Sequence, residues 1–246
     1  MNPSASPHRA PVDARLLDVP SLAYREGLEL MRGLVEAKSD AGLPEVLILT
    51  EHEPVLTLGR RSEPTDVRVS SACLAEKGIA VHRIERGGLA TYHGPGQLVA
   101  YPIFDIRSMH LGVGDLVTRL EEVLLRTLAD FGLAGNRRPG YRGVWTGDEK
   151  IASIGIAVRR GITFHGLALN CDPDLSHFDL ITPCGIQGVR MTSMARRLGT
   201  PVAAAAVRRT MAEHVADLFG LDFSPWSLDE ARRVSSDAIS TRDIAT

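Results

Sequence analysis

Hydrophobic side chains recur every three or four residues in three stretches of the chain, which is the spacing of one face of an α-helix. The clearest stretch runs from Val113 to Phe131, where alternating steps of three and four residues place the apolar side chains on one face. A second begins after Ser21, a residue suited to an N-cap, and ends before Gly42, and a third spans about 202–219. We expect these helices to pack their apolar faces on a sheet.

Between the helices, short apolar runs bounded by turn residues are typical of β-strands. We expect strands, in chain order, at 45–50, 55–59, 79–84, 97–101, 143–145, 151–158 and 162–170. The sequence 159–161 suits a hairpin turn, and Pro102 predicts an edge position or a bulge, because proline donates no backbone hydrogen bond. Strands and helices interleave without regular βαβ alternation, which predicts an α+β (mixed α/β) fold in a single domain.

The two ends of the chain lack a sustained apolar pattern. Residues 1–14 are rich in Pro, Ala and Ser, and residues 229–246 are polar, so we expect two tails around one domain at 15–228. A length of 246 residues is ordinary for a single core. No apolar run approaches the roughly 20 residues that span a bilayer, and the N-terminus lacks a signal peptide, which predicts a cytoplasmic protein without membrane contact.

Composition and charge disfavour several functional classes. The hydrophobic fraction of 44% and the net charge of −2 are ordinary for a soluble protein and provide no basic field for nucleic acid. The chain has three cysteines, an odd number, and no secretory signal, and both features argue against a disulfide framework. Neither Cys-x-x-Cys nor His-Glu-x-x-His occurs, and 172–179 fits a polar loop with Asx turns, so we expect no metal site.

One cysteine lies in a turn and is the candidate nucleophile. Pro183 and Gly185 flank Cys184; the proline disfavours a helix, and the glycine lets a ligand approach the backbone closely. Cys73, at helix-like spacing, and Cys171, at the end of an expected strand, fit buried apolar cysteines. A free thiol, with a pKa of ~8.5, is mostly protonated at neutral pH, so Cys184 requires an activator.

Lys150 is the candidate activator. It precedes the small and apolar stretch 152–155, which could desolvate its amine and prepare it for proton transfer. The alternative is a solvated hairpin lysine, the usual state of this residue type.

A glycine-rich segment at 86–97 supplies a third feature. Its glycines exceed what a turn needs and predict backbone N–H groups that face a carbonyl or an anion. Their spacing matches neither a phosphate loop nor a dinucleotide fingerprint. His93 and His165 could each orient a substrate, act as a base or form a structural hydrogen bond. Together with the thiol and the amine, the segment indicates acyl transfer through a thioester.

These segments resemble one family, the octanoyltransferases of lipoate biosynthesis, which move octanoyl from acyl carrier protein to a lysine of lipoyl domains. The resemblance rests on the segments 51–60, 86–97, 143–145, 150–155, 165–170, 183–186 and 192–194. It implies an acyltransferase with the fold of biotin and lipoate protein ligases, a mixed sheet with helices on one side. One departure is Leu89-Ala90, where a polar and then a branched residue are common.

The resemblance also assigns roles to residues. Cys184 would form the acyl-thioester and Lys150 would tune the thiol. The acyl pocket would be lined by Arg86, Gly87, Gly88, Leu89, Ala90, Thr91, Tyr92, His93, Ser153, Ile154, Gly155, Gly166, Leu167 and Ala168. The implied donor is octanoyl-acyl carrier protein. The implied acceptors are lipoyl domains of 2-oxoacid dehydrogenase E2 subunits and the glycine cleavage H protein, and we expect a monomer without cofactors.

An acidic carrier protein requires a basic docking patch on a mildly acidic chain. The candidates, which border Lys150 in the sequence, are Arg137, Arg138, Arg142, Arg159 and Arg160. Two other functions stay open. An ATP-dependent lipoate or biotin protein ligase would make Cys184 incidental, and a binding module would hold a carrier or lipoyl domain without turnover.

Overall fold

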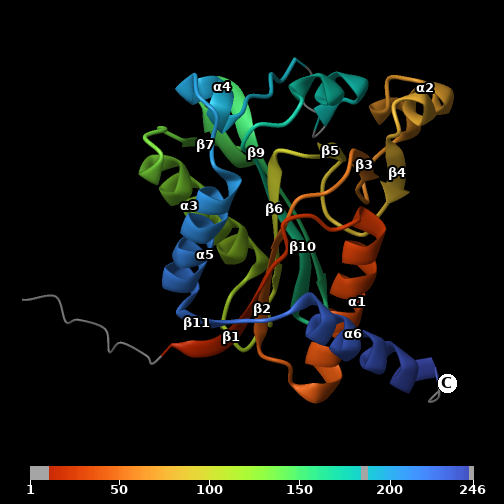
Figure 1. The fold of residues 1–246 in the computed structure, drawn as a ribbon, viewed down its shortest axis with the longest axis vertical. Helices are drawn as coiled ribbons and strands as arrows, with labels where there is room; N and C mark the ends of the chain where they lie inside the picture. The colour runs from red at the N-terminus through yellow and green to blue at the C-terminus, as the bar shows by residue number, and fades with distance from the viewer. Residues whose placement is uncertain (1–10, 184–187, 244–246) are drawn as a thin grey trace, which may run out of the picture.

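The computed structural model describes residues 11–183 and 188–243, which are built around an eight-stranded mixed sheet (Figure 1). Its strands, in spatial order, are β11 (Leu221–Pro225), β1 (Val12–Asp18), β2 (Glu45–Thr50), β6 (Gln97–Ile103), β10 (Ile162–Asn170), β9 (Glu149–Arg159), β8 (Tyr141–Thr146) and β7 (Asn136–Arg138). β1 runs parallel to both of its neighbours, and the other pairs in this sheet are antiparallel. The predicted α+β class with a mixed sheet is confirmed.

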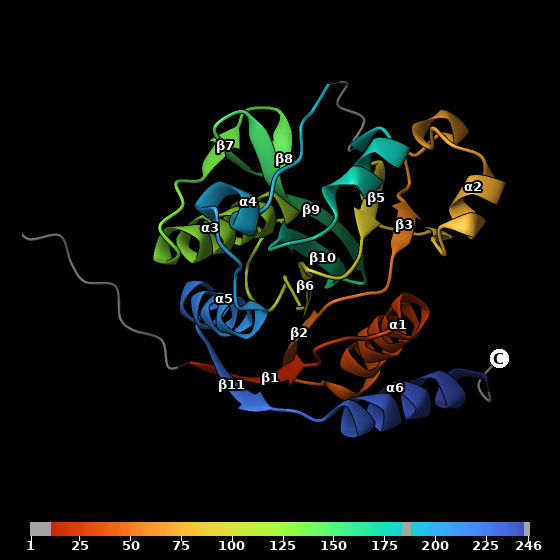
Figure 2. The same ribbon diagram turned by 45° about the horizontal axis from the view of Figure 1, so that its top comes forward.

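Helices cover both faces of this sheet because its strands are apolar on both faces. In β2, Val46 and Ile48 belong to the core beneath α1 (Tyr24–Ala41), whereas Leu47 and Leu49 belong to the core beneath α3 (Val113–Asp130) and α5 (Ala204–Phe219). Figure 2 shows α3 and α5 together on one side and α1 on the other. The expectation of helices on one side alone is therefore wrong; a strand buried on both faces requires two covering layers.

A smaller sheet joins the large one near its centre. It consists of β4 (Ala80–Arg83), β3 (Val55–Leu58) and β5 (Ala90–His93), in that order. A third core lies under it, with contributions from α2 (Ser71–Glu76) and the 3₁₀ helix η2 (Leu175–Leu180). A second 3₁₀ helix, η1 (Pro64–Asp66), and the short α4 (Met194–Leu198) lie in connecting segments. The sequence pattern did not predict β5, because its short run sits between glycines and its pairing with β3 is a tertiary contact.

Several predicted elements have the bounds that their patterns indicated. β2, β10 and α3 agree closely, and the β9–β10 turn has positive φ at Arg160 (54°) and Gly161 (84°), as a type I′ hairpin requires. α1 is capped at Ala23 rather than Ser21. Pro102 lies in a central strand, so the edge expectation is wrong. It is tolerated because the ladder between β6 and β10 ends at Ala100, before the proline is reached.

The two ends of the described chain are more ordered than their composition predicted. β1 begins at Val12, inside the expected N-terminal tail. Residues expected as a polar tail form α6 (Leu228–Asp243), which packs Ala231 and Ser235 against α1. Gly33 of α1 makes this packing possible, because an added Cβ there would overlap Ser235. The contact also includes the partly buried Leu228 and Val234, so small and apolar side chains together hold α6 on the core.

None of the helices within the described ranges has the length and apolar character needed to cross a bilayer.

Candidate functional site

A cavity of about 460 Å³ lies where β5 of the small sheet meets β9 and β10 of the large sheet. Its volume falls within the roughly 300–1,000 Å³ of small-molecule sites. Apolar side chains form much of its wall; they are Ile84, Leu89, Val113, Val117, Ile154, Ile156, Leu167 and Ala168. A cavity of this size and character suits a short aliphatic chain.

Two glycines that face each other in the sheet allow close contacts with two different segments. Gly155 of β9 and Gly166 of β10 lie opposite each other in the sheet register. A Cβ on Gly155 would lie 2.8 Å from Arg86 Cδ, and a Cβ on Gly166 would overlap the carbonyl of Ala100. Gly87 donates its N–H to the Ile156 carbonyl at 2.9 Å. Gly155 thus lets the segment after β4 bind directly to the sheet and form one wall of the cavity, whereas Gly166 allows the close approach of β10 and β6.

Arg86 fixes the start of this wall. Its side chain is buried, and Nη2 donates to the carbonyl and the Oγ1 of Thr57 in β3, at 2.7 and 2.8 Å. A guanidinium held in this way places a permanent positive charge at the cavity, since arginine stays protonated in proteins.

The side chains of 86–93 do not all face the cavity. Within β5, Thr91 and His93 line it, whereas Ala90 and Tyr92 belong to the core under the small sheet. The Tyr92 hydroxyl forms a hydrogen bond with His177 Nδ1 at 2.8 Å, and the Tyr92 ring packs on Phe178. The other residues assigned to the pocket, at 86–89, 153–155 and 166–168, do line the cavity. Strand alternation explains the correction for Ala90 and Tyr92, because adjacent residues point to opposite faces.

Lys150 is a buried lysine in the wall of the cavity, with 2% of its surface exposed. Its Nζ lies 4.9 Å from the centre of the Trp145 ring, within the range of a cation–π contact. Gly143 makes room for it, because a Cβ there would lie 3.2 Å from Lys150 Cε, and Glu121 holds the Gly143 N–H at 3.1 Å. The interpretation of Lys150 as a solvated hairpin lysine is thereby excluded.

Cys184 lies outside the described residues, but the segments on both sides of it have defined contacts. Before it, the Thr182 N–H donates to the carbonyl of Asp66 at 2.8 Å. After it, Lys150 donates its N–H to the Arg190 carbonyl at 2.8 Å and accepts from the Thr192 N–H at 2.9 Å. The chain that follows the cysteine is therefore bound directly to the backbone of Lys150.

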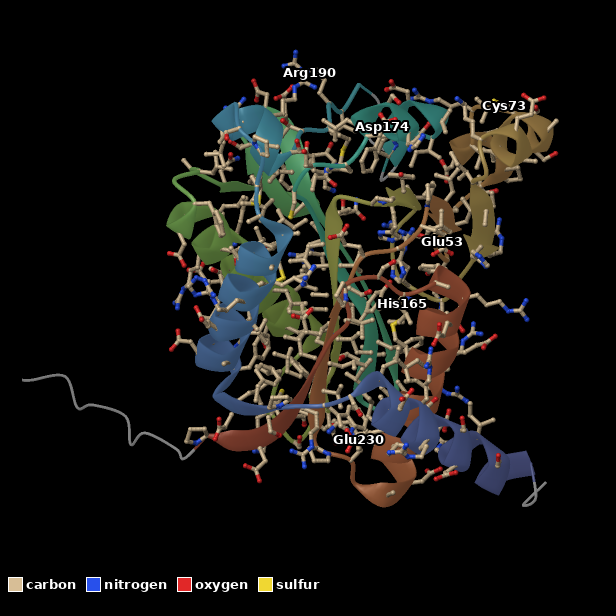
Figure 3. The ribbon with its side chains drawn as sticks, in the orientation of Figure 1. Glu53, Cys73, His165, Asp174, Arg190 and Glu230 are labelled. Atoms are coloured by element: carbon tan, nitrogen blue, oxygen red, sulfur yellow. The ribbon has the colours of Figure 1, made fainter. Side chains whose placement is uncertain are left out.

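The other two cysteines lie outside the lining of the cavity. Cys171 is buried in the core beneath α3 and α5, and burial raises the pKa of its thiol to about 12. Cys73 lies on α2, at the periphery, whereas His165 lies in the interior (Figure 3). Neither thiol lines the cavity.

Two buried histidines line the cavity. His93 bonds through Nδ1 to Gln97 Oε1 at 2.6 Å, and burial, with a smaller effect of His52, lowers its pKa to about 3. The Nε2 of His165 lies 3.6 Å from Glu85 Oε2, and burial lowers the pKa of this imidazole. His165 also has a φ of 56°, which is unusual for a residue with a side chain. Burial therefore disfavours the charged form of both rings, and the neighbouring Glu85 opposes this effect at His165.

Some cavity residues were missed by the sequence analysis. Val113 and Val117 were assigned to the core, yet they lie at the first turn of α3 and face the cavity. Tyr24, at the start of α1, also lines the cavity, and Glu53 accepts a hydrogen bond from its N–H at 3.0 Å. Arg61, which was also missed, lies exposed at the same cavity beside Arg142, which the sequence analysis had named for docking.

The described part of the chain contains no cluster of three His, Cys, Asp or Glu residues that could hold a metal ion. In the stretch 172–179, Asp174 forms an Asx turn, as expected, by accepting from the Ser176 N–H at 2.9 Å. The residues that follow form the 3₁₀ helix η2 rather than the expected loop.

Comparisons with known proteins identify the family of the chain. The family model described as the lipoyl protein ligase A/B catalytic domain matches residues 23–216. An octanoyltransferase of Syntrophobacter fumaroxidans is 42% identical over 91% of this chain and 98% of its own length. An octanoyltransferase of Acidobacterium capsulatum is 48% identical over 73% of this chain and 78% of its own.

Among solved structures, the fold is similar to that of a lipoate-protein ligase A bound with ATP. The two share a TM-score of 0.71 over 92% of this chain and 93% of the other, at 17% identity. At an identity this low, the comparison shows a shared fold only.

Proposed function

The chain belongs to the octanoyltransferases of the lipoyl protein ligase A/B catalytic domain family, and we propose the route by which it transfers the acyl group. Octanoyl passes from octanoyl-acyl carrier protein to a thioester on Cys184, and from there to the ε-amine of a lysine on a lipoyl domain. The acceptors are lipoyl domains of 2-oxoacid dehydrogenase E2 subunits and the glycine cleavage H protein. Membership of this family makes the protein an enzyme of the acyltransferase class.

One observation carries this proposal. A lysine amine is buried in the wall of an apolar cavity, and its backbone binds the chain that follows Cys184. An amine at such a position can take up a proton from a thiol and return it to a leaving group, which are the general-base and general-acid steps of acyl transfer. The arrangement therefore supports a thiol nucleophile beside a site for an aliphatic chain.

In the first transfer, the thiolate of Cys184 attacks the carbonyl carbon of the donor thioester. The new C–S bond forms, the carbonyl becomes an oxyanion, and backbone N–H groups of the glycine-rich wall stabilise it. The oxyanion collapses and breaks the donor's C–S bond. Lys150 returns the proton to the departing carrier thiol, and the octanoyl chain stays among the apolar side chains of the cavity.

In the second transfer, the lysine amine of the lipoyl domain attacks the thioester on Cys184. A C–N bond forms and the C–S bond breaks, so that the nitrogen loses one proton and the cysteine sulfur gains one. The amide product leaves and the thiol is restored. Neither transfer needs nucleotide, because a thioester is already an activated acyl group.

Transfer is expected to proceed at the full rate when nucleotide is omitted and EDTA is present. The measurement is octanoylation of an apo lipoyl domain, followed by mass spectrometry, with octanoyl-acyl carrier protein as donor. A matched reaction with free octanoate, ATP and magnesium should give no product. A requirement for ATP and magnesium would instead assign the chain to the ligases whose fold it shares.

The structure revises the expected docking patch for the carrier protein. Arg137 pairs with Glu121 and Glu122, and Arg138 with Asp148. Arg159, the last residue of β9, and Arg160, in the turn that follows, both pair with Glu36 of α1. Most of the expected patch is thus already neutralised by carboxylates of the same chain.

Two exposed arginines at the cavity are better placed to meet an acidic carrier. Arg61 and Arg142 both border it, and within residues 11–183 and 188–243 neither guanidinium forms an ion pair. Charges at the rim of an interface act mainly on association and on its salt dependence.

Reversing these charges in Arg61→Glu and Arg142→Glu should raise the KM for octanoyl-acyl carrier protein about tenfold at low salt and flatten its salt dependence. Arg209→Glu makes the same change of charge on exposed α5, away from the cavity, and should leave the KM unchanged. If Arg209→Glu weakens the carrier as much as the rim variants do, net charge rather than a patch governs docking.

A further inference from the structure

His93 is the last residue in a chain of buried hydrogen bonds. The residue at the opposite end of this chain determines which group donates and which accepts in every bond. Asn170 donates through Nδ2 to the carbonyl of Thr192 at 2.9 Å. Gln97 Nε2 lies 2.8 Å from Asn170 Oδ1, and His93 Nδ1 lies 2.6 Å from Gln97 Oε1. All four residues are buried. The same Thr192 donates its N–H to Lys150, so the chain links the backbone of Lys150 to a ring in the cavity wall.

Each link in this chain fixes the next. A carbonyl oxygen can only accept, so the Asn170 amide must turn its NH₂ group to Thr192 and its oxygen to Gln97. Gln97 must then turn its NH₂ group to Asn170 and its oxygen to His93. An amide oxygen also only accepts, and His93 must therefore carry its proton on Nδ1. A flipped amide at either position would bring two acceptor oxygens together in the protein interior.

The opposite ring nitrogen of His93 is consequently an acceptor. With Nδ1 protonated and the ring neutral, Nε2 carries a lone pair. Nothing within the described part of the chain forms a hydrogen bond with Nε2, and His93 forms part of the cavity wall. The low pKa of His93, about 3 and caused mainly by burial, agrees with a ring that stays neutral. The cavity wall thus contains a hydrogen-bond acceptor, His93 Nε2, and residues outside the cavity fix the position of the ring proton.

We propose that His93 Nε2 accepts a hydrogen bond from the attacking amine of the acceptor lysine and so orients it toward the thioester, an inference that rests on the transfer to an amine proposed above. A neutral amine has two N–H donors and one lone pair. Holding one N–H on Nε2 directs the lone pair toward the carbonyl carbon. The buried Arg86 guanidinium at the same cavity favours the neutral amine over the ammonium, because like charges repel.

The proton balance leaves His93 unchanged. When the C–N bond forms and the C–S bond breaks, the amine proton is lost from nitrogen and the sulfur of Cys184 gains one. His93 is neutral before and after the step. It acts in the second transfer only, because the donor thioester brings no amine to the cavity.

The two transfers can be measured separately. The first is acyl-enzyme formation from octanoyl-acyl carrier protein, and the second is decay of the isolated acyl-enzyme on mixing with an apo lipoyl domain. His93→Leu should leave the first rate unchanged and slow the second about 10²-fold, the scale of a lost orienting contact. His93→Gln places an amide oxygen near the position of Nε2 and should recover most of that loss. His214→Gln, on the surface of α5 beside Asp130, is the matched histidine control.

A spectroscopic measurement tests the tautomer without relying on a variant. The ¹⁵N shifts of the His93 ring in the wild-type protein should report Nδ1–H and an unprotonated Nε2 at neutral pH. A proton on Nε2 would overturn the proposal. So would equal rates of the second transfer in wild type and His93→Leu, or a loss confined to acyl-enzyme formation. If the wild type itself forms no acyl-enzyme, the thioester route fails instead, and that outcome is distinct from all of these.

Discussion

Replacing Cys184 by alanine is expected to abolish the acyl-enzyme and to lower octanoyl transfer by at least about 10³-fold, the scale seen when a covalent nucleophile is removed. The reason is chemical: no other thiol of the described chain reaches the cavity. Intact-mass measurement after incubation with octanoyl-acyl carrier protein should show one octanoyl increment on the wild type and none on Cys184→Ala.

The two remaining cysteines provide the controls. Cys171→Ser and Cys73→Ser should both retain the increment. Cys171 is buried with a pKa raised to about 12, so it holds almost no thiolate near neutral pH. Cys73 lies on α2, outside the cavity lining. An octanoyl adduct that persists in Cys184→Ala and maps to Cys171 would reject the assignment of the nucleophile.

The elements that the sequence predicted well are those whose pattern is local. α3 has an unbroken apolar face, and β2 and β10 are apolar runs between turn residues, so burial and local geometry favour the same structure. β5 and α6 depend instead on partners far along the chain. β5 exists because β3 offers it a ladder, and α6 packs because Gly33 admits Ser235. Neither signal is visible in a local window of the sequence.

The features of the candidate site also divide into those that the sequence predicted and those that depend on contacts between distant residues. The segments that form the cavity were predicted from composition and from the family resemblance, and most of their residues line it. The exclusion of Ala90 and Tyr92 required knowledge of β5, whose alternation separates them from Thr91 and His93. The ring proton of His93 required Asn170 and Thr192, which are distant in sequence. A docking patch drawn from sequence proximity could not take account of ion-pair partners such as Glu36 on other elements, and of its five arginines the proposed patch keeps Arg142.

Replacing Lys150 by methionine is expected to move alkylation of Cys184 by iodoacetamide to higher pH and to lower transfer at least about 10²-fold, as for loss of a proton-transfer group. Methionine has nearly the length of lysine, and its sulfur can pack on the Trp145 ring that now lies beside the amine. The packing of this buried position is therefore largely kept while the amine is removed. The measurement is the rate of labelling as a function of pH, by mass spectrometry.

Lys150→Arg separates charge from proton exchange. A guanidinium keeps a positive charge near the thiol and stacks on an aromatic ring, but it does not release its proton in a protein. Cys184 should therefore label readily in Lys150→Arg, yet the carrier thiol would lack its proton donor and transfer should stay slow. If the labelling curve of Lys150→Met overlays that of the wild type, Lys150 does not activate the thiol. His165 then becomes the better candidate for that role, because it lines the same cavity and its Nε2 lies 3.6 Å from Glu85 Oε2.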